Sequence, residues 1–177
     1  MKSLFLSFAP PKTWRNKNQS RKLEGEEWKE FRKKILERDN YTCVYCSYKS
    51  EKYQVVDHID GNPENNSENN MQVICQMCNL IKHAGQGCVI QSVVDLYKKS
   101  KYNQNAIIKI TMKMRDEGAG DNEIIKVLEL KEKVHFKMDL EYLRRFFGFI
   151  SSRTPRERDM YYYWLNYHKK EIKDKNK

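Results

Sequence analysis

Two short cysteine motifs constrain the fold of this chain more than any other feature. Cys43 and Cys46 enclose two residues, Cys75 and Cys78 enclose two more, and 28 residues lie between the pairs. Two such CxxC motifs can place four thiolates tetrahedrally around one Zn²⁺ ion, and this regular spacing argues against four unrelated cysteines. We therefore predict a structural zinc site that stabilises the short segment between the motifs.

Length and composition narrow the class of protein. A chain of 177 residues can bury a core without disulfides. No apolar run approaches the roughly 18 to 20 residues of a membrane-spanning helix, and the apolar stretch at residues 4–9 is too short for a typical secretory signal. Because zinc-binding thiols also require reducing conditions, we predict an intracellular, cytoplasmic protein without a membrane segment.

The net charge of +10 is unevenly distributed along the chain. Residues 1–41 carry a net charge of +5, residues 42–88 of −2 and residues 89–177 of +7. Basic flanks around an acidic middle would suit a protein that holds a polyanion with its flanks and a cation in its middle. The charge distribution by itself is equally consistent with a basic surface that contacts only solvent.

Hydrophobic periodicity organises the first half of the chain. It predicts a helix over 25–38, a strand over 53–58, a turn-rich loop over 60–69, a strand over 71–74 and a helix from about 75 to 83. Beyond residue 88, apolar stripes predict helices over 90–97, 107–114, 124–128, 140–147 and 161–168.

These patterns predict an α+β fold with three parts. A basic N-terminal arm covers residues 1–24, a zinc-stapled core with its own N-terminal helix covers 25–88, and a basic, α-helical region covers 89–177. Residues 107–128 have the outline of a helix-turn-helix, in which Lys126 would face DNA, although any helical hairpin shares this outline. Arg144 and Arg145 belong to a second basic cluster, where phosphate contact competes with simple solvation.

Four polar residues between and beside the cysteine motifs are candidates for catalysis. Asp57 and His58 end the first predicted strand, Asn70 begins the second, and Asn79 follows Cys78. Carboxylate and amide oxygens suit Mg²⁺, and a neutral histidine can take a proton from water. Neighbouring strand residues point to opposite faces, so Asp57 and His58 could share a site only if the strand ends or bends there.

Residues 28–83 resemble the HNH endonuclease family, which has a ββα-metal fold. The matching stretches are Arg38-Asp39, Asp57-His58, Asn70 to Cys75 and Cys78 to Lys82, and Asn79 stands where many members have histidine. The resemblance implies that His58 is the general base and that Asp57 and Asn79 bind a catalytic Mg²⁺ or Mn²⁺ ion. It also implies that Asn70 braces the hairpin and orients His58, and that cleavage leaves 5′-phosphate and 3′-hydroxyl ends.

The resulting functional hypothesis is a Mg²⁺-dependent HNH endonuclease that cuts DNA in a restriction, homing, phage or defence setting. Lys82 and His83 follow Asn79 and are candidates for contact with DNA, with a polar helix surface as the alternative. A zinc-containing nucleic-acid-binding module without nuclease activity is the main alternative, and RNA cleavage is a third. A homodimer or a protein partner is left open.

Overall fold

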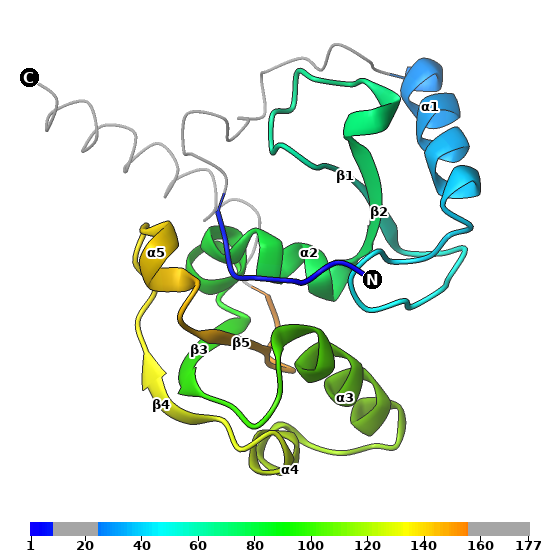
Figure 1. Ribbon diagram of the computed structural model, residues 1–177. Helices are drawn as coiled ribbons and strands as arrows, with labels where there is room; N and C mark the ends of the chain where they lie inside the picture. Colours follow the sequence, from blue (N-terminus) through cyan, green and yellow to red (C-terminus); the bar gives the residue numbers. More distant parts are fainter. Residues whose placement is uncertain (9–24, 156–177) are drawn as a thin grey trace, which may run out of the picture.

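A computed structural model describes residues 1–8 and 25–155 of the protein (Figure 1). Helix α1 spans Gly25–Arg38, as the periodicity predicted, and buries Ile35 and Leu36. Its first turn carries Glu26 and Glu27 and its last turn carries Arg38. This arrangement of charges complements the helix dipole and explains why the helix has these ends.

A β-hairpin followed by a helix forms the centre of the first half. Strand β1, Gln54–His58, pairs antiparallel with β2, Met71–Cys75, so that Gln54 faces Cys75 and His58 faces Met71. Helix α2, Gln76–Lys82, begins directly after β2. The two predicted strands and the helix after them are therefore confirmed, in the order expected of a ββα unit.

The second half is a mixed structure, whereas helices alone were predicted. Strands β3 (Val94–Lys99), β4 (Lys131–Val134) and β5 (Phe147–Ile150) form a sheet in the order β4-β3-β5. Around the sheet lie a short π-helix and helices α3, α4 and α5, with bounds Gln86–Ile90, Gln104–Asp116, Asp121–Val127 and Leu140–Leu143. The α+β class is confirmed by this mixture of helices and strands.

One predicted helix is wrong and another was predicted too long. The segment 90–97 contains β3, because Val94, Leu96 and Tyr97 are buried in a central strand and a strand packed on both faces has no clean alternation. The predicted helix over 140–147 stops at Leu143, and Phe147 begins β5, which pairs with β3. Helices α3 and α4 confirm the helical hairpin, and the helix predicted over 161–168 lies outside the described residues.

The first eight residues, which belong to the predicted N-terminal arm, pack into the core. Leu4 and Leu6 are buried in one cluster with the four cysteines of the CxxC motifs, Ile81 of α2 and Leu143 of α5. The segment crosses α2 (Figure 1), where Ser7 O accepts a hydrogen bond from Ala84 N at 2.8 Å. The remainder of the predicted arm, residues 9–24, falls outside the description.

A buried asparagine joins the two halves. Asn105 of α3 donates to Lys2 O at 2.7 Å and to Tyr45 O at 2.6 Å, and it accepts from Leu4 N at 2.8 Å. These bonds fasten α3 to both the N-terminal segment and the first cysteine motif. Within residues 1–8 and 25–155, no helix is long and apolar enough to cross a membrane.

Candidate active site

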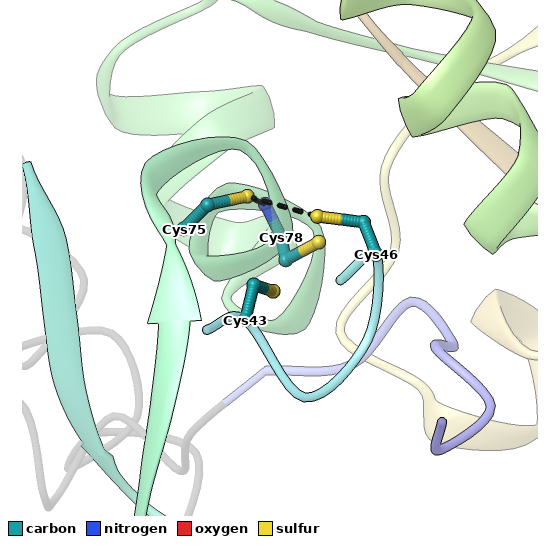
Figure 2. A group of neighbouring side chains, drawn as sticks. All are labelled: Cys43, Cys46, Cys75 and Cys78. Carbon is teal, nitrogen blue, oxygen red and sulfur yellow. Dashed lines mark hydrogen bonds between the residues drawn. The ribbon is translucent and has the colours of Figure 1, made fainter. Parts of the chain in front are cut away.

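The four cysteines of the two CxxC motifs converge on one point. Their sulfur atoms all lie within 4.8 Å of one another, and the Sγ atoms of Cys46 and Cys75 are 3.6 Å apart. Figure 2 shows the sulfurs of both motifs turned toward a shared centre. Tetrahedral Zn–S bonds of about 2.3 Å place sulfurs about 3.8 Å apart, so the spacing fits zinc. With four protein ligands such a site is closed and structural.

The electrostatics of this cluster also call for a cation. Hydrogen bonds from the other three thiols lower the pKa of Cys43. The interactions with Cys43 and Cys46 raise the pKa of Cys75 and Cys78, and burial raises both further. The interaction with Cys43 raises the pKa of Cys46, but hydrogen bonds with Cys75 and Cys78 lower it more. Cys43 and Cys46 therefore ionise more readily than the other two thiols, whereas four thiolates would repel one another in a buried space. A divalent cation removes that repulsion and allows all four sulfurs to ionise.

The pair Arg38-Asp39 fastens the end of α1 to the hairpin. Arg38 donates to Glu68 O at 2.7 Å and to Met71 O at 2.8 Å, and it also bonds to Asp39. Asp39 Oδ2 in turn accepts from Val73 N at 3.2 Å. This part of the family motif thus positions β2, and with it the loop that connects the two strands.

Asp57 is a buried carboxylate that faces α2. Its side chain is 6% exposed, and Oδ2 accepts from Lys82 Nζ at 2.5 Å and from Gln72 Nε2 at 2.9 Å. Its Oδ1 lies 3.1 Å from His83 Nε2. Burial raises the pKa of Asp57, but hydrogen bonding with His83 and the charge of Lys82 lower it more. The net shift is downward, so Asp57 is an anion at neutral pH.

His58 is the last residue of β1 and contacts the loop that follows. Its Nε2 lies 3.0 Å from Asn66 Oδ1, and its carbonyl oxygen accepts from Lys82 Nζ at 2.5 Å. With Asn66 Oδ1 as the acceptor, Nε2 carries the proton and Nδ1 keeps its lone pair. Asn66 was not among the predicted site residues, and the asparagine-rich composition of its loop was the available signal.

Asn70 braces this loop from inside. The residue is 8% exposed, its Oδ1 accepts from Asp60 N at 3.1 Å, and its Nδ2 donates to Asp60 Oδ1 and Asn65 O, both at 2.9 Å. The bracing role fits these contacts. The imidazole of His58 is held by Asn66, so any influence of Asn70 on His58 passes through the loop.

The remaining candidates lie on several elements. Asn79 is half-buried on α2, one helical turn before His83, whose backbone N–H bonds to Asn79 O at 2.9 Å. Lys82 and His83, predicted to contact DNA, both contact Asp57 in the structure, and their contact with DNA stays a prediction. The exposed side chains of Lys126, on α4, and of Arg144 and Arg145, after α5, belong to the second half.

Comparison with known proteins identifies the central segment. Residues 43–85 match the HNH endonuclease family, and this segment, with its four convergent cysteines, is an HNH domain. The family points to a nuclease or to another function related to nucleic acids.

One similar protein is the Type 4 apparatus protein DotN of Legionella pneumophila, which is 36% identical over 70 residues. The aligned region covers 40% of this chain and 32% of DotN, so it spans about a third of that protein. By its name, DotN is part of an apparatus.

Proposed function

We propose that the chain is a divalent-metal-dependent HNH endonuclease that hydrolyses phosphodiester bonds in DNA. The observation that carries this proposal is the buried carboxylate of Asp57 at the end of β1, next to His58 and facing α2 inside the HNH domain, with a pKa that its partners lower. Burial of a carboxylate is costly unless a cation or several donors compensate it, and active sites commonly maintain such groups.

The residues around Asp57 fit a hard divalent cation. Asp57 offers a carboxylate oxygen, and Asn79, one helical turn before His83, offers an amide oxygen; both are ligand types that Mg²⁺ or Mn²⁺ prefers. His83 Nε2, 3.1 Å from Asp57 Oδ1, is a further candidate ligand. The ammonium group of Lys82 lies between Asp57 Oδ2 and His58 O, so a cation is already accommodated at this carboxylate. When bound, the metal ion would act as a Lewis acid that stabilises charge on the phosphate and the departing 3′ oxygen.

His58 would act as the general base. Its Nδ1 accepts a proton from the attacking water, while Asn66 holds the Nε2–H group and so sets the tautomer. Asn70 keeps the loop that carries Asn66 in place. The expected products carry 5′-phosphate and 3′-hydroxyl ends.

The basic second half would hold the substrate. Residues 89–177 carry a net charge of +7, and Lys126, Arg144 and Arg145 expose their side chains. Phosphate contacts by such residues bind DNA without regard to sequence and weaken as salt concentration rises. Among the described residues nothing supports a homodimer, and the proposal does not include one.

A zinc-stabilised nucleic-acid-binding module without nuclease activity is the second candidate. The ion pair between Lys82 and Asp57 favours it, because the ammonium satisfies the carboxylate without a metal ion. The likeness to an apparatus protein points in the same direction. Under this alternative the HNH domain would provide a scaffold, and the protein would bind nucleic acid without cutting it.

Cleavage of supercoiled plasmid with Mg²⁺ separates the two candidates. We expect the wild-type protein to cut, and His58→Ala to lower the rate roughly 100- to 10,000-fold, which is the usual contribution of a general base. DNA affinity, measured by fluorescence anisotropy, should stay unchanged. His135→Ala is the matched control, because His135 is exposed and lies outside the site.

Wild-type protein that binds DNA but leaves it intact with either Mg²⁺ or Mn²⁺ would refute the nuclease proposal in favour of the binding module. A labelled RNA substrate in competition with DNA would test the third hypothesis, which is that the protein cleaves RNA. Ligation of the products without kinase treatment would verify the expected ends.

A further inference from the structure

The ion pair between Lys82 and Asp57 differs from the other lysine ion pairs of the protein. The side chains of Lys82 and Asp57 are 14% and 6% exposed. In every other lysine ion pair that the structure describes, the lysine side chain is at least 51% exposed. Surface pairs of that kind contribute little, whereas a buried pair holds its partners firmly because neither charge can turn to water.

The two oxygens of Asp57 have unequal surroundings. Oδ2 accepts from both Lys82 and Gln72, whereas Oδ1 has His83 as its one hydrogen-bond partner among the described residues. Lys82 also bonds to the carbonyl oxygen of His58 at 2.5 Å. Its ammonium group therefore lies between two oxygens in the manner of a bound cation, on the same carboxylate that the proposed function assigns to the metal ion.

A metal ion that binds to Asp57 would lie close to the ammonium group of Lys82, and the two cations would repel each other. Two positive charges near one buried carboxylate repel each other, and burial leaves little water to screen them. Lys82 lies in the last turn of α2, and its flexible side chain needs a new anion before it leaves Asp57. A phosphodiester group of the substrate is an anion that this ammonium could contact.

We propose that Lys82 is a resident cation that competes with the divalent metal ion for Asp57 and exchanges Asp57 for a substrate phosphate. This inference rests on the proposed function. Metal ion and DNA would then bind cooperatively, since each favours the state in which Lys82 has left Asp57. The protein without DNA would bind the metal ion weakly, so the metal site would be filled mainly when DNA is bound.

Binding of Mn²⁺ to the zinc-loaded, full-length protein tests the proposal without any cleavage. Electron paramagnetic resonance measures the free ion, and the hard Mn²⁺ ion is a poor competitor for four thiolates. We expect Lys82→Met to bind Mn²⁺ roughly tenfold more tightly or better, since loss of one neighbouring charge has about this effect even at the dielectric constant of water. Lys82→Arg, which keeps the charge, should resemble wild type. Lys33→Met removes an exposed lysine of α1 and serves as the matched control.

A non-cleavable phosphorothioate duplex supplies the second measurement. It should strengthen Mn²⁺ binding to the wild-type protein and have a much smaller effect on Lys82→Met. If Lys82→Met does not fold, Lys82→Gln takes its place, because the amide retains a hydrogen-bond donor without the charge.

The possible failures are distinguishable. Equal or weaker Mn²⁺ binding by the folded Lys82 variants, with binding still lost in Asp57→Asn, would overturn the competition and leave the proposed metal site standing. If Asp57→Asn binds Mn²⁺ as wild type does, the metal site of the proposed function fails, and the competition fails with it.

Discussion

Replacement of Asn70 by alanine tests whether the loop after β1 is held from inside. The variant removes three hydrogen bonds of 2.9 to 3.1 Å, two to Asp60 and one to Asn65. At about 1 kcal/mol for each bond, and with the exposed Asp60 carboxylate free to rehydrate, we expect a loss of about 2 to 3 kcal/mol in the free energy of unfolding. Asn69→Ala is the matched control, because the neighbouring side chain is exposed and has no hydrogen bond in the described structure.

Urea unfolding of the zinc-loaded proteins, followed by circular dichroism, gives the free energy of unfolding of each variant for comparison with wild type. Asn69→Ala should lie within about 0.5 kcal/mol of wild type, as is usual for surface substitutions. Because the loop also carries Asn66, cleavage by Asn70→Ala should fall under conditions where the variant is fully folded. Equal stabilities of the two variants would refute the reasoning, since the buried amide would then contribute no more than an exposed one.

Two further outcomes are expected. Metal analysis should find about one zinc ion per chain. Cys46→Ser should unfold the HNH domain, because the four cysteines share a core with Leu4 and Ile81. A folded protein without zinc would contradict both expectations. Burial raises the pKa of Asp121, but bonds from Ser152 and Arg115 lower it more, so the net shift is downward from 3.8. The stability that ionised Asp121 contributes is fully present above pH 3.8 and is lost as pH falls through the lower pKa of the folded state. The midpoint of urea unfolding should therefore fall less steeply below about pH 4 in Asp121→Asn than in wild type.

The first half of the fold was predictable because its signals are local. The apolar stripe of α1 and its terminal charges specify a helix over Gly25–Arg38 without reference to the rest of the chain. The spacing of the cysteines likewise specifies four ligands, because each CxxC motif can bind only in a tight turn. The helix and each CxxC motif depend on residues within a few positions of one another, and only the meeting of the two motifs spans 28 residues.

The second half was harder to predict because its strands depend on distant partners. Val94, Leu96 and Tyr97 fit a helical stripe as well as a strand, and β3 exists because β4 and β5 pair with its two edges. Those partners lie more than 30 residues further along the chain. Periodicity within a short window contains no information about such pairing.

The candidate site divides along the same line. The zinc ligands could be read from the spacing of the cysteines, and Asp57, His58 and Asn79 could be named from a family motif. Only the tertiary structure placed the ammonium group of Lys82 on Asp57 and the amide of Asn66 on the imidazole of His58. The physical reason is that a buried charge or a tautomer is set by whichever donors the folded chain brings within about 3 Å, and those contacts arise only when strand, loop and helix pack together.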